Sequence, residues 1–382
     1  MKVWLANFMI FFSFMVLTPL LPLYLSDTFG VGKHTIGLIL SGYTLTALLV
    51  RGFSGWLVDS YPRRLVLLTS YFFFFLFFGG YFFAGWGLAL FAVLRTLHGA
   101  PFGTVTVANS TVAIDVLHSS RRAEGIGYYG LSNNLATAIS PSIGLYIYGQ
   151  TGSYDLIFLT ALLTSGVGLA INASLQLSTR PTVPNKQHLS LDRFFLLKGW
   201  SESVAMVTYS FSYGVLVTFI AIYSRDELGI TEGSGLFFTV LCCGLIFSRL
   251  VGSWTLRQGK ILQNATLGVT VSVFGYLLFA AVKSEIGYYG AALIIGLGNG
   301  HMFPAFQNMF INLAPNSQRG TANSTLLTSW DVGMGLGIVL GGAVAEIAGY
   351  SAAFWMAWLV NLSGVLFFYL WVRRNYQKNK LR

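Results

Sequence analysis

The segment that decides the fold is Gly55-Trp-Leu-Val-Asp59-Ser-Tyr-Pro-Arg63-Arg64, a short polar bridge between two long apolar stretches. A shift of 197 residues, without a gap, aligns it with a degraded copy, Gly252-Ser-Trp-Thr-Leu-Arg257-Gln-Gly-Lys260. The same shift pairs Gly32 with Gly229, Gly99 with Gly296, Gly103 with Gly300, Arg122 with Arg319, Gly144 with Gly341 and Gly152 with Gly349. Matches at one constant offset predict two parallel copies of a membrane unit, with paired glycines at equivalent places.

The composition excludes an ordinary soluble enzyme. Of the 382 residues 54% are apolar and only 9% are charged, whereas soluble domains carry about 25% charged residues. The two cysteines, Cys242 and Cys243, are adjacent, so they offer neither a disulfide framework nor the spacing of metal ligands.

Apolar stretches of about 20 residues, enough to cross roughly 30 Å of hydrocarbon as a helix, recur along the chain. They fall near 4–25, 35–58, 65–84, 87–115, 123–149, 154–176, 199–223, 234–256, 262–282, 287–313, 320–346 and 351–372. The only long polar connection is Ser178 to Arg193. We therefore predict an all-α integral membrane protein of 12 transmembrane helices in two six-helix parallel repeats: a bundle at 1–177, a cytoplasmic linker at 178–193 and a second bundle at 194–382.

The net charge of +10 follows the membrane topology. Of the 23 Lys and Arg, only Lys33, Arg225 and Lys283 fall in one set of alternate loops, and Arg51, Arg95 and Arg249 lie within apolar stretches. The others cluster in the opposite loops and at the termini, which by the positive-inside rule places both termini in the cytoplasm. The basicity thus orients the chain in a bilayer, and no nucleic-acid partner is expected.

The Gly55–Arg64 bridge has the chemistry of a conformational latch. Gly55 permits close packing against a helix of the other half, and Asp59 can cap a neighbouring helix N-terminus, where carboxylates are favoured. Arg63 and Arg64 can bridge to Asp115 and Glu124, although both arginines also satisfy the positive-inside rule. We expect Asp59→Asn to slow transport with folding largely intact, since exposed ion pairs contribute little stability.

These residues resemble the loop motif between helices 2 and 3 of the major facilitator superfamily, with Ser60 in place of a basic residue and Pro62 in place of a glycine. The run Leu94-Arg95-Thr-Leu-His98-Gly99 is similar to that superfamily's helix 4 motif. Ser140-Pro141-Ser-Ile-Gly144 resembles its antiporter motif in helix 5, and Asp331-Val-Gly333 with Gly349-Tyr350 resembles the 12-helix drug/proton antiporter branch. The likeness covers the whole chain.

Charged residues at membrane depth cost at least about 2.5 kcal/mol and call for a partner or a task. Asp331 lies near mid-membrane, and its counterpart under the 197-residue shift is the neutral Asn134. We therefore predict Asp331 as a proton carrier, with a permanent ion pair as the alternative. Arg95, by the resemblance, faces a central cavity and assists coupling. Glu202 is interpreted as a partly solvated charge at a helix N-terminus, and the glycines of 333–342 and 144 as close crossings between the two halves.

By the resemblance, the cavity is lined by helices 1, 4, 7 and 10. Their polar and aromatic members are Asn7, Phe11, Phe14, Thr18, Arg95, His98, Tyr209, Tyr213, Asn299, His301 and Gln307. Such a wall suits an amphipathic molecule that is held by aromatic contacts and few hydrogen bonds. Three arginines at membrane depth against one aspartate favour a zwitterionic or weakly anionic substrate.

The leading interpretation is therefore a monomeric, proton-coupled antiporter that exports a small amphipathic organic compound by alternating access, in a bacterial inner membrane. An importer or lipid-handling transporter of the same fold remains open, as does a membrane channel. Scattered histidines and the lack of a phosphate-binding glycine loop argue against a catalytic site, a metal site, a cofactor or ATP use.

Overall fold

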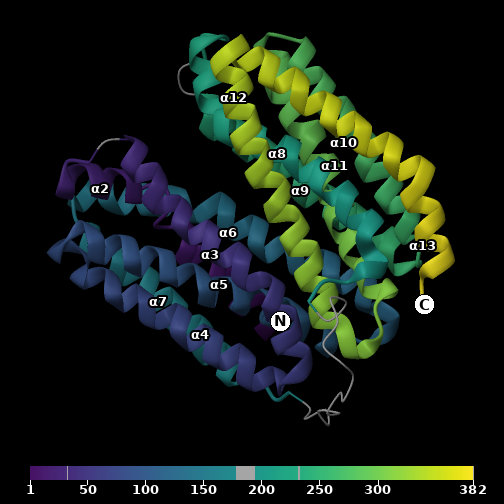
Figure 1. Cartoon of the computed structure of the whole chain (residues 1–382), viewed down its shortest axis with the longest axis horizontal. Coiled ribbons are helices and arrows are strands. Elements are labelled where there is room, and N and C mark those ends of the chain that lie inside the picture. The colour runs from purple at the N-terminus through teal and green to yellow at the C-terminus, as the bar shows by residue number, and fades with distance from the viewer. Residues whose placement is uncertain (32, 178–193, 231–232, 382) are drawn as a thin grey trace. The chain divides into compact units, whose positions relative to one another are not determined.

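The computed structural model describes residues 1–31, 33–177, 194–230 and 233–381, and every regular element within them is a helix (Figure 1). The predicted linker at 178–193 lies outside the described residues. The first half contains α1 (Lys2–Met15), α2 (Leu21–Phe29), α3 (Lys33–Ser60), α4 (Arg63–Gly80), η1 (Tyr81–Trp86), α5 (Leu88–Val116), η2 (Ser119–Arg121), α6 (Arg122–Thr151) and α7 (Tyr154–Ala173). The second half contains η4 (Leu197–Gly199), α8 (Trp200–Asp226), α9 (Gly233–Arg257), α10 (Ile261–Ala281), α11 (Glu285–Leu313), η5 (Asn316–Gln318), α12 (Arg319–Phe367), η6 (Phe368–Val372) and α13 (Arg373–Asn379).

The prediction of an all-helical, twelve-span protein is confirmed. Among the described residues, eight stretches are long and apolar enough to cross a membrane, and one of them, Asn316–Asn379, contains two spans. Gly349, at φ 84° and ψ 165°, breaks the helical path there. Three further spans complete the twelve. The first is formed by α1 and α2 together, the second by α6 and the third by α11. The first of these is interrupted after Met15, and the other two carry more polar residues.

The described chain divides into two packing units. Unit 1 comprises Met1–Val116, Ser132–Phe194 and Ser317–Ser324, and unit 2 comprises Leu117–Leu131, Phe195–Asn316 and Thr325–Arg382. The start of α6 is therefore grouped with unit 2, and the start of α12 with unit 1.

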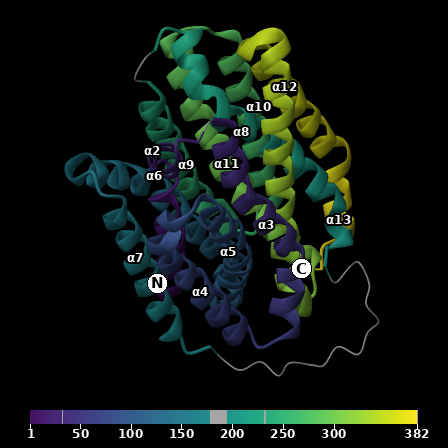
Figure 2. The same ribbon diagram turned by 60° about the vertical axis from the view of Figure 1, so that its left-hand side comes forward.

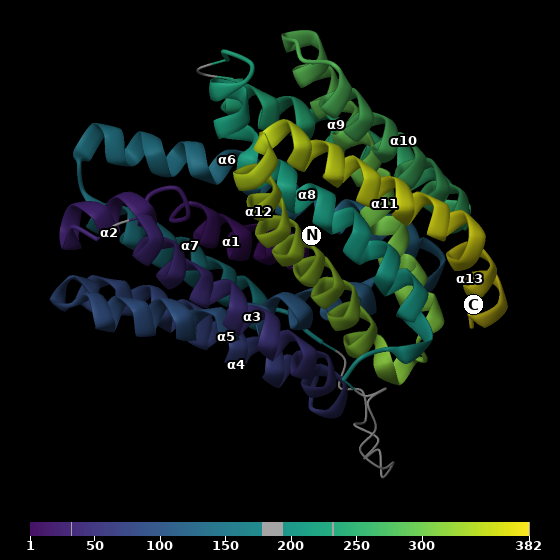
Figure 3. The same ribbon diagram turned by 45° about the horizontal axis from the view of Figure 1, so that its top comes forward.

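Unit 1 is built on close contact between helices that are distant in sequence. α3 packs along α5, α4 along both α5 and α7, and α1 along α7 (Figures 1 and 3). Gly99 lies where α5 crosses α3, because a Cβ there would stand 2.1 Å from the carbonyl oxygen of Tyr43. Small residues at such crossings let helices approach in lipid, where no hydrophobic force drives them together.

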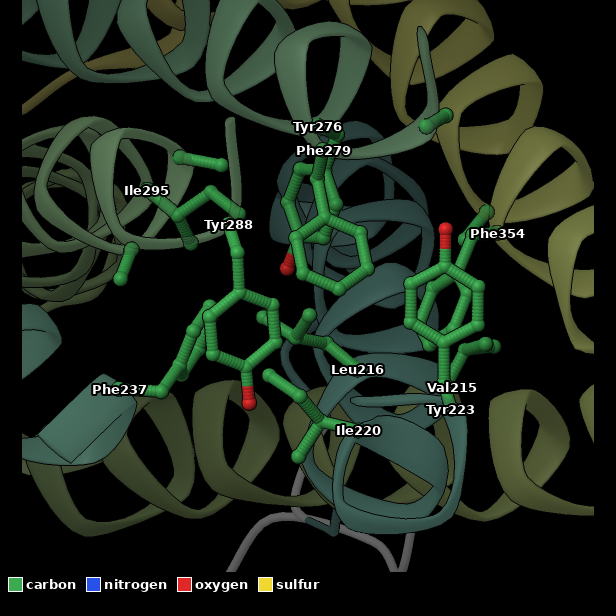
Figure 4. Packing of buried hydrophobic residues seen from close by; sticks show 14 of the residues in the cluster. Val215, Leu216, Ile220, Tyr223, Phe237, Tyr276, Phe279, Tyr288, Ile295 and Phe354 are labelled. Atoms are coloured by element: carbon green, nitrogen blue, oxygen red, sulfur yellow. The ribbon is translucent and has the colours of Figure 1, made fainter. Parts of the chain in front are cut away.

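Unit 2 repeats this pattern, with α11 packed between α9 and α10 (Figure 2). Its aromatic core draws on five helices: Figure 4 shows Phe279 of α10 among Tyr223 of α8, Phe237 of α9, Tyr288 of α11 and Phe354 of α12. The ring centroids of Phe279 and Phe354 are 4.7 Å apart. Edge and tilted ring contacts of this kind each contribute about 0.5–1.5 kcal/mol beyond the area that they bury.

The gapless register of 197 residues is wrong for the helices that precede Leu88. α5 and α11 begin 197 residues apart, at Leu88 and Glu285, but α4 and α10 begin 198 apart, at Arg63 and Ile261. The first half thus has one extra residue before Leu88, in the stretch that contains the 3-10 turn η1. Ahead of that stretch, equivalent residues are 198 apart.

The contacts of α3 and α9 agree with this shifted register. Ser54 bonds Thr104 of α5 at 3.1 Å, and the residue that faces the equivalent His301 of α11 is Gly252. Gly252 is therefore the counterpart of Ser54, and not of Gly55 as expected. Gly144 and Gly341 do match, since each faces a valine of the first span of its own half: Val16, directly after α1, and Val215 of α8.

Candidate functional site

Asp59, at the end of α3, caps the start of α12. Its Oδ1 accepts a hydrogen bond from the backbone N–H of Gly320 at 2.8 Å. Its Oδ2 accepts from the backbone N–H of Thr321 at 2.8 Å and from the Thr321 hydroxyl at 3.0 Å. The first N–H groups of a helix have no partner within it, so a carboxylate here satisfies donors and opposes the positive end of the helix dipole.

Two arginines and a second aspartate complete what we name the Asp59 cluster: Asp59, Arg63, Asp115 and Arg319. Arg63, at the start of α4, lies 3.4 Å from Asp59 and also pairs with Asp115 at the end of α5. Arg319 donates from Nη1 to Asp115 at 2.7 Å and is only 3% exposed. Carboxylates and guanidinium groups thus alternate, and the described contacts join α3, α4, α5 and the start of α12.

Gly55 explains how α12 comes so close to α3. A Cβ at this position would stand 2.7 Å from Cβ of Ser324 and 2.8 Å from Cα of Thr321. Asp59 lies one turn after Gly55 in α3, so any larger residue at position 55 would push the start of α12 away from Asp59. Arg64 takes a different direction and donates to the carbonyl oxygen of Ala173 at 3.1 Å. The structure therefore brings Gly55, Asp59, Arg63 and Asp115 together, but leaves Arg64 outside the cluster.

In unit 2 the equivalent position carries the opposite charge. With the offsets of 198 and 197, Asp59 corresponds to Arg257 and Thr321 to Glu124. Arg257 lies 3.2 Å from Glu124, whose carboxylate also accepts from Arg121 at 3.0 and 3.3 Å. These hydrogen bonds to Glu124 raise the pKa of the exposed Arg121. We call Arg121, Glu124 and Arg257 the Glu124 cluster. The predicted pairing of Glu124 with Arg63 and Arg64 is therefore corrected: its described partners are Arg121 and Arg257.

Arg95 lies at the centre of an aromatic cage in unit 1. Its guanidinium carbon is 4.1 Å from the ring centroid of Tyr43 and 5.5 Å from that of Phe14. Nη1 donates to the Tyr81 hydroxyl at 3.2 Å, and that hydroxyl is 3.0 Å from Nδ1 of His98. Arg95 is 4% exposed, and in the described residues no carboxylate lies within ion-pair distance of it.

The cage contains several residues predicted from the sequence. Phe14 stacks on Tyr43 and on Phe102, with ring centroids 5.0 and 4.9 Å apart, and Phe11 meets Phe102 edge-on at 5.9 Å. Phe11, Phe14 and Arg95 therefore do come together. Tyr43 and Phe102 were missed, because their place depends on helix rotations that one sequence does not give.

The residues predicted in the second half are divided between two places. Tyr213 of α8 packs at 5.5 Å on Trp330, the neighbour of Asp331, and Asp331 itself is half-buried. Tyr209 is buried against Phe306 at 6.0 Å.

On α11, His301 turns to α10. Its Nδ1 is 2.8 Å from Oδ1 of Asn264, and its carbonyl oxygen accepts from Nδ2 of Asn264 at 3.0 Å. Asn299 and Gln307 are buried on the same helix. Sequence periodicity had no signal for the Asn264 contact, because it depends on how α10 and α11 are rotated.

A chain of asparagines holds the helices of unit 1 together. Asn172 of α7 donates to Asn109 of α5 at 3.1 Å, Asn109 donates to Asn7 of α1 at 3.3 Å, and Asn7 donates to Ser132 of α6 at 2.8 Å. All four side chains are buried. Asn7, expected in the cavity wall, is thus bonded within the bundle.

The glycine-rich helices approach helices of their own half, which corrects the expected crossing between halves. In α12, a Cβ on Gly333 would stand 2.3 Å from the carbonyl oxygen of Val207, and one on Gly337 would stand 2.1 Å from that of Phe211, both in α8. In α6, a Cβ on Gly144 would stand 2.4 Å from the carbonyl oxygen of Val16. Ser140, one turn before it, bonds its own helix at Ala136, and Pro141 lies within α6.

A family model, the Major Facilitator Superfamily, matches residues 3–337 and 289–382. The chain belongs to this superfamily. It is therefore a membrane transporter with a small-molecule substrate, and the recognition from the helix 2–3 motif is confirmed.

Relatives and solved structures agree with this assignment. The chain is 22% identical to the staphylopine export protein of Staphylococcus aureus, over 96% of this chain and 92% of that protein. It is 24% identical to the quinolone resistance protein NorA of the same species, over 94% and 92%. Its fold matches that of the human organic anion transporter MFSD10 with a TM-score of 0.81 and 15% identity, over 96% and 97%.

Proposed function

We propose that this transporter is a proton-coupled antiporter, and that it exports a small amphipathic compound with an anionic or zwitterionic group. The observation that carries the proposal is the cage around Arg95, a buried cation whose described neighbours are rings and a hydroxyl. A buried charge is costly unless it is paired or has a task. A substrate carboxylate would supply the missing charge, and Phe14 and Tyr43 would contact its apolar part.

The direction of transport is proposed as export. Two relatives named for export or drug resistance support it, the staphylopine export protein and NorA. The Ser140-Pro141-Gly144 pattern of α6 favours the same branch.

Coupling to protons is assigned to Asp331, with Arg95 assisting. Asp331 is half-buried in α12, beside the Tyr213–Trp330 contact. Its counterpart in α6 is Asn134, which has the same size but does not titrate. One half of the repeat thus has a group that can bind and release a proton, while the other has only a dipole.

The Asp59 cluster is proposed as a conformational latch. Of its six hydrogen bonds and ion pairs described above, four involve the start of α12. These four would form or break together when that helix end moves. We further propose two six-helix bundles, 1–177 and 194–382, joined by a cytoplasmic linker at 178–193. Both termini would lie in the cytoplasm of a bacterial inner membrane, and the protein would act as a monomer without cofactor or enzymatic activity.

The test is transport in proteoliposomes with an imposed pH gradient. An amphipathic dye with a carboxylate is compared with its neutral amide and with a cationic analogue. We expect the carboxylate to be moved best, and Arg95→Gln to remove that preference, because a charge-assisted hydrogen bond contributes about 1.5–3 kcal/mol. Equal transport of all three dyes by the parent would contradict the substrate class, and transport indifferent to the pH gradient would contradict proton coupling.

A further inference from the structure

Glu202, the third residue of α8, is a buried carboxyl with few partners. The expectation of a partly solvated group at this position is wrong, since the residue is 0% exposed. Its Oε2 accepts one hydrogen bond, from the hydroxyl of Ser201 at 2.8 Å. Its Oε1 is buried without a hydrogen-bond partner, and no basic group among the described residues forms an ion pair with it.

The polar groups that the structure describes next to Glu202 are neutral. Tyr376 of α13 is a titratable side chain that interacts with it, and the Tyr376 hydroxyl accepts a hydrogen bond from Asn312 of α11 at 3.0 Å. The hydroxyl of Ser201 also accepts from Asn375 of α13 at 2.8 Å. In η4, the nearest cation in sequence, Lys198, is exposed to the surroundings of the protein.

An ionised carboxylate that has lost its water needs several donors or a cation to replace it. The Glu202 carboxyl has only the Ser201 hydroxyl and its own backbone N–H as described donors, and its Oε1 has no hydrogen-bond partner. A protonated carboxyl needs fewer hydrogen-bond donors than a carboxylate, because it is neutral and only its carbonyl oxygen strongly requires one. We infer that Glu202 is a second proton-binding site of this transporter, whose proton is exchanged during the transport cycle. The inference rests on the proposed proton coupling and adds a group that the family motifs do not contain.

The place of Glu202 in its helix offers a simpler explanation. Acidic residues are common in the first turn of helices, where they oppose the dipole. Glu285 of α11 and Asp155 of α7 occupy such places, and both are exposed. Glu202 differs from them because it is buried, and among the described groups only the Ser201 hydroxyl and its own backbone N–H replace its lost hydration.

Asn375 also connects the site to the end of the chain. Its Oδ1 accepts from Nδ2 of Asn379 at 2.8 Å, and the flanking residues Lys378 and Lys380 are exposed. A hydrogen-bonded row therefore leads from the buried carboxyl along α13 towards its exposed end. A small movement of α13 would open Glu202 to water, which gives the proton a route of exchange.

Two measurements on the full-length protein test the inference, with Glu202→Gln as the isosteric variant and Glu285→Gln as the matched control at an exposed helix start. The first is the infrared carbonyl band of a protonated carboxyl at neutral pH. It is recorded in an Asp331→Asn background, so that Asp331 does not contribute. We expect Glu202→Gln to lose band intensity, and Glu285→Gln to keep it. An unchanged band in Glu202→Gln would overturn the inference.

The second measurement is dye uptake on a pH gradient, compared with dye exchange in the absence of a gradient. We expect Glu202→Gln to lose gradient-driven uptake while exchange persists, and Glu202→Asp, which keeps a titratable group, to restore part of it. If Glu202→Gln kept full uptake, Glu202 would have no part in coupling. If the parent showed the infrared band but no gradient-driven uptake, the proposed function would fail, and with it the role of this proton in transport, although the protonated carboxyl would stand.

Discussion

Replacing Asp59 with asparagine separates the carboxylate's chemistry from its shape. Oδ2 accepts two of the three hydrogen bonds from the start of α12, both from Thr321. An amide nitrogen in its place can accept neither, and the charge that opposes the helix dipole is lost as well. Hydrogen bonds to charged groups contribute about 1.5–3 kcal/mol, and a charge at a helix N-terminus about 0.3–1 kcal/mol. The two bonds from Thr321 share one acceptor atom, and we count them as one contribution, so the contact should weaken by about 2–4 kcal/mol.

This magnitude is larger than the sequence suggested. The expectation of a small effect assumed an exposed ion pair, but the Asp59 side chain is only 9% exposed. Because each 1.4 kcal/mol is tenfold in an equilibrium constant, a loss of 2–4 kcal/mol shifts the balance between closed and open contact by roughly 30- to 1,000-fold. Asp59→Asn should thus slow transport and also lower thermal stability measurably.

The state of the contact is read by cysteine labelling. In a background with Cys242 and Cys243 replaced by serine, a cysteine is placed at Ala322, which is 0% exposed. We expect a maleimide to label it slowly in the parent and much faster with Asp59→Asn. Asp155→Asn, which removes an exposed helix-start carboxylate, is the control and should leave the rate unchanged. Equal labelling and equal transport in Asp59→Asn and the parent would refute the latch.

Three further predictions concern other contacts. Arg257→Glu places two carboxylates together and should slow transport, and adding Glu124→Arg should restore the rate. The free energy of unfolding should change by less than about 1 kcal/mol, since Arg257 is 49% exposed. If the double variant did not recover transport, the pairing would be contradicted. Gly333→Ala should destabilise the protein by about 1–3 kcal/mol in thermal unfolding, because the added Cβ would clash with α8. Gly335→Ala is the control and should be neutral or stabilising, since open space surrounds that position. Similar changes in stability for both variants would contradict the packing of α12 on α8. Asp331→Asn should abolish pH-driven uptake and leave exchange largely intact, and a well-folded variant that still concentrates dye on a pH gradient would eliminate Asp331 as carrier.

The sequence predicted the parts of this protein that depend on composition and spacing along one helix. The lengths of the apolar stretches predicted the helices and their number, and the spacing of Gly55 and Asp59 predicted that both lie on one face of α3. The sequence did not predict which residues on neighbouring helices contact each other. Tyr43 and His301 illustrate the limit: the first contacts Arg95 and the second Asn264, and both contacts depend on the rotation of two helices at once. The register error has a related cause, since the extra residue lies in a turn that carries no matching glycine.

The Gly252–Lys260 segment has Arg257 where the first half has Asp59, so it looks like a degraded copy of the Gly55–Arg64 segment. The first turns of α12 and α6 explain why the charge differs. α12 has no acidic residue in its first turn, so its free N–H groups need a carboxylate from another helix, and Asp59 supplies it. α6 carries Glu124 in its own first turn, so the positive end of that helix already has an anion. An aspartate at 257 would meet Glu124 with like charge, whereas an arginine forms an ion pair with it. The two segments are therefore copies of one contact, in which the sign of the charge on α3 or α9 follows from the residue at the helix start that it faces.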